Sequence, residues 1–275
     1  MDTHTASAPS PPVPSDGFEM LRRRAAFGIS SCVHEFIHYR ETVPGLFRQV
    51  ETASLVVPLV ISFGTPFAIG LGRDPGSDET YGSFASGLFP GQVVIHSTGF
   101  SDCIQVNFTP LGAWRFFGLP MSELAARMVT LDDLAGRDIR ELRLRLADQA
   151  DPVRRVDLVE SFVTGRLLCS AAYDPVSEAA YALLLRQNGD VRISRLAARL
   201  DLSRKHLAER FRAAIGVPPK TVARIMRFNR AQQLARAGED WADIAASCGY
   251  ADQAHLAREF QEMSGSTPTA WKAAA

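Results

Sequence analysis

The sequence has no long apolar run. Its longest candidate, Leu55 to Phe63, is interrupted by Pro58 and falls well short of the ~20 residues that a membrane-spanning helix needs. The N-terminal residues are rich in Pro and Ser and lack the basic and then apolar layout of a secretory signal. We therefore expect a cytoplasmic protein that has no membrane partner.

Cysteine is also scarce. The four cysteines, Cys32, Cys103, Cys169 and Cys248, are widely scattered. No pair has the short spacing typical of metal ligands, and proteins of the cytosol rarely keep disulfides. We expect neither a metal nor another cofactor. Cys248 falls on the apolar face of a predicted helix, where a small core residue is expected.

The chain has no excess of charge of either sign, with 30 Lys and Arg against 30 Asp and Glu. The charges are nevertheless unevenly distributed. From Arg186 to Arg236 there are 13 basic residues and only three acidic ones. One basic lobe in a neutral chain suits a protein that contacts phosphates in one place. A solvated helical surface is the alternative explanation.

A length of 275 residues suggests about two domains. We expect a disordered tail at residues 1–17, an N-terminal domain at 18–170 and a C-terminal domain at 171–275, with the linker at Ala171 to Pro175. The tail is rich in Ala, Pro, Ser and Thr, so it cannot bury a core. Phe18 to Ala26, with three arginines in a row, is ambiguous: the arginines either touch phosphate or belong to a solvated lead-in to the first domain, and we favour the lead-in.

Short apolar runs separated by Gly, Pro and Asp occupy the region from Gly28 to Thr109. Several alternate apolar with polar residues, which is the period of a strand with one buried face. Successive strands without helices between them predict an antiparallel sandwich or small barrel. The expected strands are Ile29 to Tyr39, Leu55 to Phe63, Phe67 to Leu71, Ser83 to Phe89, Gln92 to His96 and Cys103 to Phe108.

After Pro110 the apolar spacing becomes helical. In Pro152 to Cys169 it gives a stripe that is either core or a dimer interface. The fold class is therefore α+β: an antiparallel β sandwich or barrel followed by helices, then an all-α domain. The helices expected before the linker are Leu111 to Phe117, Met121 to Met128, a short turn at Leu131 to Gly136, Ile139 to Ala147 and Pro152 to Cys169.

The C-terminal region contains the same pattern twice. In Ile193 to Gly216, two short amphipathic segments flank a break, and Ser203 is placed to cap the second one. Trp241 to Pro268 repeats the arrangement, with Asp252 as the expected cap. Leu207 and Phe211 in the first copy have the spacing of Leu256 and Phe260 in the second, and a glycine follows each pair. Such a repeat, joined by a helix over about Pro219 to Arg236, predicts two helix-turn-helix motifs.

These motifs resemble the DNA-binding domain of the AraC/XylS family of bacterial transcription regulators. The resemblance implies double-stranded DNA as a partner, RNA polymerase as the partner of an activator, and an N-terminal domain that binds a small-molecule effector or forms a homodimer. Activator and repressor both remain open. Pro110 to Gly136 more loosely resembles a segment in N-terminal domains of the family. The matching C-terminal residues are Leu196-Ala197, Leu202-Ser203, His206-Leu207, Phe211, Gly216, Pro218 to Lys220, Arg227 to Ala231, Ile244-Ala245, Cys248 to Tyr250, Asp252-Gln253, His255-Leu256, Arg258 to Phe260, Gly265 and Thr267-Pro268.

Side chains on the exposed face of a helix in the major groove reach base edges. The resemblance places Lys205, Ala208 and Glu209 in base-facing positions. Many relatives have arginine where this chain has Glu209, which either accepts from cytosine or holds Lys205 in an i, i+4 pair. The candidates of the first motif are Arg204, Lys205, His206, Ala208, Glu209 and Arg212.

In the second motif, Gln253 is suited to adenine and Arg258 to guanine or to phosphate. His255 is either a reader or a plain surface residue. On the linking helix, Lys220 and the arginines Arg224, Arg227 and Arg230 are expected to face outward and neutralise phosphates. The helix is long enough to hold the two readers about one DNA turn apart, roughly 34 Å. The candidates of the second motif are Gln253, Ala254, His255, Ala257 and Arg258.

An enzyme or a protein-binding module in the N-terminal domain is the alternative function. The segment around Ser83 and Ser86 lacks the spacing of a nucleophile elbow. His34 and His38 lie four apart in a predicted strand and have no clear third ligand. We therefore predict a regulator that is not an enzyme.

Overall fold

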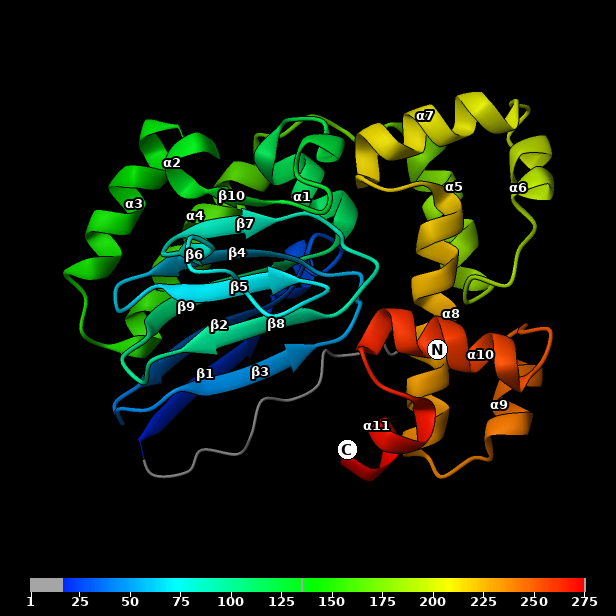
Figure 1. Cartoon of the computed structure of the whole chain (residues 1–275). Helices are drawn as coiled ribbons and strands as arrows, with labels where there is room; N and C mark the ends of the chain where they lie inside the picture. The colour runs from blue at the N-terminus through cyan, green and yellow to red at the C-terminus, as the bar shows by residue number, and fades with distance from the viewer. Residues whose placement is uncertain (1–16, 135, 275) are drawn as a thin grey trace.

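A computed structural model describes residues 17–134 and 136–274. Figure 1 shows a two-layered β structure with helices on one side of it and a helical C-terminal lobe beside it. The fold is α+β, as the sequence predicts. Of the tail expected at residues 1–17, only Gly17 lies within the described residues. In these ranges no helix is both long and apolar enough to cross a bilayer.

Two antiparallel sheets form the sandwich. The larger sheet has the strand order β1-β2-β9-β4-β7-β10 and the smaller one β3-β8-β5-β6. The strands are β1 (Phe18–Arg24), β2 (Val33–Glu41), β3 (Phe47–Glu51), β4 (Val57–Ser62), β5 (Phe67–Leu71), β6 (Thr80–Tyr81), β7 (Phe84–Ser86), β8 (Val93–Ser97), β9 (Asp102–Phe108) and β10 (Met128–Thr130).

The central strand β9 shows how the alternating pattern is used. Ile104 and Val106 are completely buried in the core beneath the helices. Cys103 and Gln105 line the space between the two sheets. The side chains of β9 that alternate with its core residues therefore face the interior of the sandwich and not the solvent.

The region from Phe18 is a strand, so its interpretation as a solvated lead-in was wrong. Strand β1 pairs along its whole length with β2, from Phe18 opposite Glu41 to Arg24 opposite Glu35. Arg22 donates to both carboxylate oxygens of Glu35, at 2.9 and 2.7 Å. Partners on the neighbouring strand thus turn an arginine-rich segment into the edge of the sheet.

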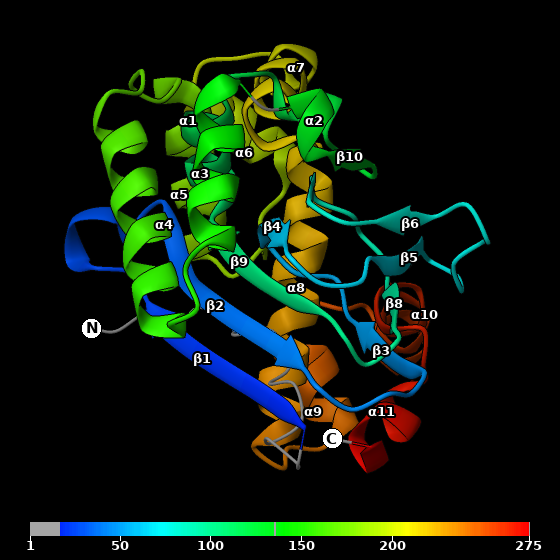
Figure 2. The same ribbon diagram turned by 90° about the vertical axis from the view of Figure 1, so that its left-hand side faces the viewer.

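Helices cover the outer face of the large sheet. Helix α4 packs against β1 and β2, and α3 packs against α4 (Figure 2). In α4, Val156, Val159, Val163 and Leu167 are buried in the core, while Phe162 is half-buried. Since this stripe packs inside the chain, it is core and offers no dimer surface. The helices here are α1 (Pro110–Phe117), α2 (Leu131–Leu134), α3 (Arg137–Ala147) and α4 (Pro152–Leu168).

The helix predicted at Met121 to Met128 is wrong. A short 3-10 turn, η2 (Met121–Glu123), is followed by strand β10. Ala126 has φ 52° and donates its N–H to Leu88, and Leu124 accepts from Gly87. These bonds to the segment after β7 satisfy the backbone outside a helix and lead the chain back into the sheet.

The C-terminal lobe consists of helices α5 (Pro175–Arg186), α6 (Ile193–Arg199), α7 (Arg204–Ile215), α8 (Pro219–Arg236), α9 (Trp241–Ser247), α10 (Gln253–Ser264) and α11 (Pro268–Ala274). Two helix-turn-helix pairs, α6–α7 and α9–α10, are joined by α8, as predicted. One apolar cluster runs without interruption from the outer face of the large sheet into the first pair. A second cluster fills the other pair and includes Ala53 from the N-terminal region.

Candidate nucleic-acid interface and inter-sheet cavity

The first helix-turn-helix is built as its sequence predicts. Ser203 accepts the backbone N–H of His206 at 3.1 Å and so caps α7. Leu207 and Phe211 are fully buried. Gly216, with φ 96°, ends the helix, because a residue with a side chain rarely adopts this backbone conformation.

The outer face of α7 carries the expected polar residues. The Lys205 side chain is 88% exposed and that of Glu209 is 56% exposed, and Lys205 Nζ lies 4.0 Å from Glu209 Oε1. The i, i+4 pair that the spacing predicts is therefore present on this surface. Arg204, His206 and Arg212 are also exposed, and Ala208 is half-buried.

The second helix-turn-helix repeats the design. Asp252 caps α10 by accepting the N–H of His255 at 2.6 Å. Phe260 is buried against Phe228 of α8, and Cys248 is a buried core residue, as expected. Gly265 ends α10 in the left-handed conformation.

The exposed residues of α10 are fewer than the sequence predicts. Gln253, Ala254 and Arg258 are exposed, whereas His255 and Ala257 are half-buried. The His255 ring packs edge-on against Tyr250, with centroids 5.4 Å apart. Among the described residues, no hydrogen bond or ion pair engages the exposed guanidinium of Arg258, so it is available to a partner.

The arginines of α8 do not face outward, and this prediction is corrected. Arg224 bonds the Glu259 carboxylate at 3.0 Å, and Arg227 approaches it at 3.6 Å while lying over the Tyr250 ring. The Nε atom of Arg230 is buried. Buried Glu259 on α10 turns Arg224 and Arg227 inward, and Lys220, at the start of α8, remains exposed.

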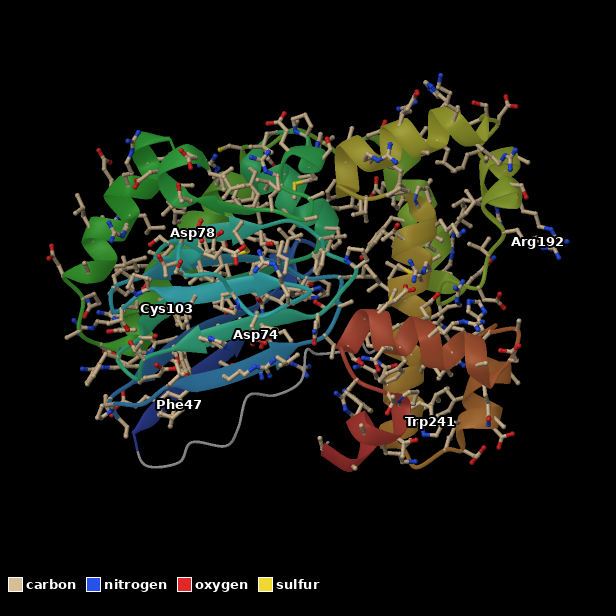
Figure 3. All side chains as sticks on the ribbon, in the orientation of Figure 1. Phe47, Asp74, Asp78, Cys103, Arg192 and Trp241 are labelled. Atoms are coloured by element: carbon tan, nitrogen blue, oxygen red, sulfur yellow. The ribbon has the colours of Figure 1, made fainter. Side chains whose placement is uncertain are left out.

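Helices α7 and α10, the second helices of the two helix-turn-helix pairs, begin on the same side of the lobe. In Figure 1 both α7 and α10 begin on the side away from the sandwich and run toward it. Figure 3 marks this side with Arg192, whose side chain extends away from the protein just before α6. The capped N-terminal halves, which carry the predicted readers, are therefore not covered by the N-terminal region.

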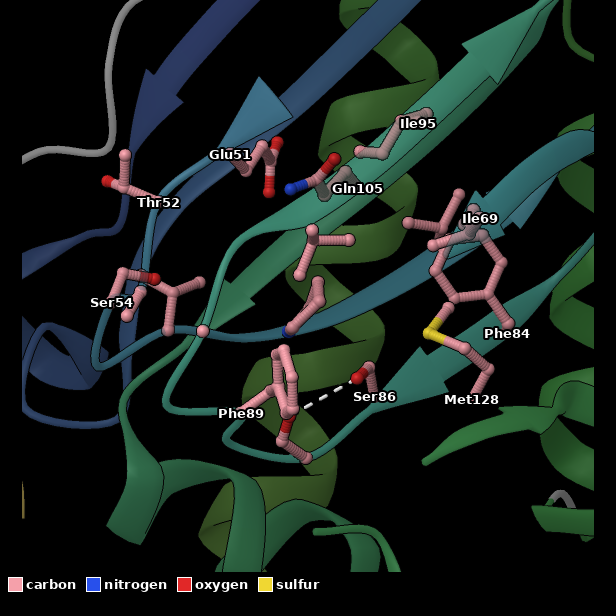
Figure 4. Close-up of a pocket in the computed structure, with 17 residues that line it drawn as sticks. Glu51, Thr52, Ser54, Ile69, Phe84, Ser86, Phe89, Ile95, Gln105 and Met128 are labelled. Carbon is pink, nitrogen blue, oxygen red and sulfur yellow. Dashed lines mark hydrogen bonds between the residues drawn. The ribbon is translucent and has the colours of Figure 1, made fainter. Parts of the chain in front are cut away.

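A separate candidate site lies between the two sheets. Adjoining cavities of about 90, 110 and 220 Å³ run through this space. The first two share Glu51, Val60 and Gln105. Figure 4 shows the side chains of Glu51 and Gln105 pointing toward each other across the cavity. Burial raises the pKa of the Glu51 carboxyl above its ordinary value.

Sequence reasoning missed Glu51 because β3 was not expected at all. The only available signal was the short alternation of Phe47 to Glu51, which resembles many exposed segments. Nothing in the sequence places Gln105 opposite Glu51.

The residues considered for an enzyme have structural partners. His38 Nε2 lies 3.3 Å from Asp102 Oδ1, and Arg155 bonds the same carboxylate at 2.7 Å. Ser83 Oγ accepts from the backbone of Ser62. Burial lowers the pKa of His34. In residues 17–134 and 136–274, no group of three or more His, Cys, Asp or Glu is placed to hold a metal ion.

In a comparison with protein families, residues 196–274 fit the model described as a helix-turn-helix domain. A search of curated proteins returns no match. Among solved structures, the DNA-binding domain of AdpA, a global transcriptional factor in complex with a target DNA, is 29% identical, covers 37% of this chain and 93% of its own, and has a TM-score of 0.34.

Two further structures are similar. ToxT from Vibrio cholerae O395 is 12% identical over 94% of this chain and 98% of its own, with a TM-score of 0.44. The C-terminal domain of AraT, a response regulator from Geobacillus stearothermophilus, is 18% identical over 38% and 89%, with a TM-score of 0.36. At these TM-scores, none of the three structures bears on what this chain binds.

Proposed function

We propose that this chain is a sequence-specific transcription regulator, on the premise that residues 196–274 form a helix-turn-helix domain. In this proposal α7 and α10 enter two successive major grooves of one DNA duplex. The observation that carries it is the pair of capped reading helices, whose polar N-terminal halves are both exposed on one side of the lobe.

The residues of α7 and α10 have different roles in this proposal. Lys205, Ala208 and Glu209 face the bases of one groove, with Lys205 and Glu209 acting as a pair. Gln253 and Arg258 read the other groove, since amide and guanidinium groups bind adenine and guanine in bidentate fashion. The remaining candidates support binding around these contacts: Arg204, His206, Arg212, Lys220, Ala254, His255 and Ala257.

Phosphate contacts come from a smaller set than the sequence suggests. Arg224, Arg227 and Arg230 are held by α10 or are partly buried, so we assign them to the lobe itself. Exposed Lys220 and Arg212 neutralise phosphates. Binding then weakens with added salt, because each phosphate contact releases a counterion.

In our proposal, the N-terminal region controls DNA binding by α7 and α10. Residues 18–170 form the sensory unit and 171–275 the DNA-binding unit. The cavity between the sheets supports a small-molecule effector, because internal spaces with a few polar groups are typical of ligand sites. RNA polymerase is the partner of an activator, and a homodimer would use a surface other than the buried stripe of α4.

The test is a footprint of the full-length protein on the DNA upstream of its own gene. We expect two protected segments one helical turn apart, which weaken together as salt rises. Arg258→Ala should cost about 1–3 kcal/mol on this DNA and less on random DNA, because a lost base contact affects only the specific sequence.

Arg140→Ala is the matched control, since Arg140 is an exposed arginine on α3 of the N-terminal region. It should leave both affinities unchanged. A single protected segment, or an equal loss on both DNAs with Arg258→Ala, would contradict the assignment of α10.

A further inference from the structure

The space between the sheets contains one carboxylate that the protein leaves unpaired. Most of the wall is apolar, with Val60, Ile69, Phe84 and Ile95 among its residues. Among the described residues, no hydrogen bond or ion pair reaches the half-buried Glu51 carboxylate. A charge that is largely withdrawn from water is costly unless something neutralises it or bonds to it.

Several other polar groups of the wall already have partners. Arg22 donates from Nε and Nη2 to the two carboxylate oxygens of Glu35, so this pair is neutral. Asn107 donates to Glu35 at 3.1 Å, and Gln105 donates to Asn107 at 2.8 Å. The Gln105 carbonyl oxygen has no donor among the described residues. The wall therefore presents unsatisfied acceptors at the Glu51 carboxylate and the side-chain amide oxygen of Gln105, and the unpaired carboxylate gives it a negative charge.

From this arrangement we propose that the inter-sheet cavity binds a small, mainly apolar molecule bearing one protonated amine, and that its binding is transmitted to the second helix-turn-helix through Thr52 to Leu55. The ammonium bonds the Glu51 carboxylate and reaches the side-chain amide oxygen of Gln105. The apolar part fills the adjoining cavities.

A cation is favoured over an anion by the same groups. An ammonium has donors and no acceptor, which matches two unsatisfied acceptors and cancels the charge of Glu51. A carboxylate ligand would place a second negative charge beside Glu51, and like charges at short range repel strongly in a poorly hydrated site. A neutral alcohol satisfies one acceptor but leaves the charge uncompensated.

The residues after Glu51 enter the DNA-binding lobe directly. The Ala53 N–H donates to the carbonyl of Met263 in α10 at 2.9 Å. Gln232 of α8 donates to Thr52 Oγ1 at 3.3 Å. Ala53 is itself buried in the apolar cluster of the second helix-turn-helix.

Only Thr52 lies between the cavity-lining Glu51 and this contact at Ala53. A shift of Glu51 on binding an amine is therefore passed to α8 and α10. This second half of the proposal rests on the proposed function, because it matters only if α10 reads DNA. The binding of an amine stands without it.

Thermal melting of the full-length protein tests the ligand class. The probes are hexylamine, cyclohexylamine and benzylamine, with hexan-1-ol and hexanoate as neutral and anionic counterparts. We expect at least one amine to raise the melting temperature, because a ligand that binds only the folded form stabilises it. Hexanol and hexanoate should raise it much less or not at all.

The matched variants are Glu51→Gln, which removes the charge, and Glu19→Gln, which removes an exposed carboxylate on β1 of the same sandwich. The amine response should disappear in Glu51→Gln and persist in Glu19→Gln. No response to any amine, an equal response to hexanoate, or an unchanged response in Glu51→Gln overturns the ligand assignment.

Amide hydrogen exchange tests the transmission to α10. With the responding amine, we expect several-fold slower exchange in peptides covering Thr52 to Leu55 and Phe260 to Gly265. Slower exchange that is confined to the sandwich overturns the proposed transmission to α10. The footprint without ligand distinguishes a failure of the proposed function from a failure of this inference. An amine response without a footprint contradicts the proposed function. A footprint without an amine response contradicts only the amine-binding inference.

Discussion

At the scale of single residues, local chemistry could be predicted and distant pairing could not. Ser203 and Asp252 were recognised as caps because a cap bonds a backbone N–H only three residues away. Glu51 was missed because its neighbour Gln105 lies 54 positions further along the chain and is brought there only by the packing of two sheets. No spacing rule connects such residues.

The unpaired carboxylate should lower the stability of the unliganded protein. Glu51→Gln keeps the shape and removes the charge, so we expect a gain of about 1 kcal/mol at neutral pH. Burial raises the pKa of Glu51, so the folded form binds this proton more tightly than the unfolded chain. The destabilisation is then largest at neutral pH and fades as the pH falls through the raised pKa.

Urea unfolding at pH 7.5 and pH 5.0 measures this difference. The advantage of Glu51→Gln should be smaller at the lower pH, while Glu19→Gln should match the wild type at both. A Glu51→Gln protein that is less stable than the wild type at pH 7.5 would mean that Glu51 has a stabilising partner in the folded state.

At the scale of elements, apolar periodicity identified the helices. It did not show whether their charged side chains face the solvent or a neighbouring helix. Helices α6 to α10 lie where apolar spacing predicts them, whereas α11 was not predicted. The arginines of α8 were assigned to the outside because they alternate with its apolar residues. Glu259 of α10 reverses that assignment for Arg224 and Arg227, since a buried carboxylate needs cationic partners.

The carboxylate of Glu259 should therefore stabilise the packing of α10 on α8. Glu259→Ala leaves Arg224 and Arg227 without their buried partner, and we expect a loss of about 3 kcal/mol in the free energy of unfolding. Because α10 is then poorly held, the DNA segment protected by α10 should be lost from the footprint before the segment protected by α7.

Glu262→Ala is the matched control. Glu262 contacts the same Arg224 but is mostly exposed, and exposed ion pairs contribute little, about 0.5 kcal/mol. Similar losses for the two variants in chemical denaturation would show that the buried network has no special role in holding α10.

At the scale of the whole molecule, the sequence indicated two regions but not how they meet. The N-terminal region touches both reading units: α7 packs against α1 and η2, and the segment after β3 enters the cluster around α10. These contacts join segments far apart in the chain and involve apolar residues that look like ordinary core. Pattern analysis cannot distinguish the core of one domain from a surface shared by two.

A pair of glycines tests the contact at α7. Gly216 and Gly238 have nearly the same φ, 96° and 94°, so alanine is strained at both. A Cβ at Gly216 would lie 2.9 Å from the carbonyl oxygen of Met121, whereas one at Gly238 would meet no atom within 4 Å. We expect Gly238→Ala to cost about 1 kcal/mol and Gly216→Ala roughly 1–3 kcal/mol more.

Calorimetry of both variants measures the difference. The extra loss in Gly216→Ala reports the approach of α7 to the N-terminal region, because the strain of the backbone is common to both. Equal losses would mean that Met121 moves away without cost and that this contact is loose.

The unbroken apolar cluster beneath α7 also limits how the protein can be re-engineered. A hybrid made by cutting near residue 171 and fusing the C-terminal part to an unrelated sensor would leave Ala214, Ile215 and Val217, which belong to that cluster, without the helices that cover them. Such a chimera would be prone to aggregate through this newly exposed apolar surface. A working hybrid would have to include α1 and η2 together with the C-terminal lobe.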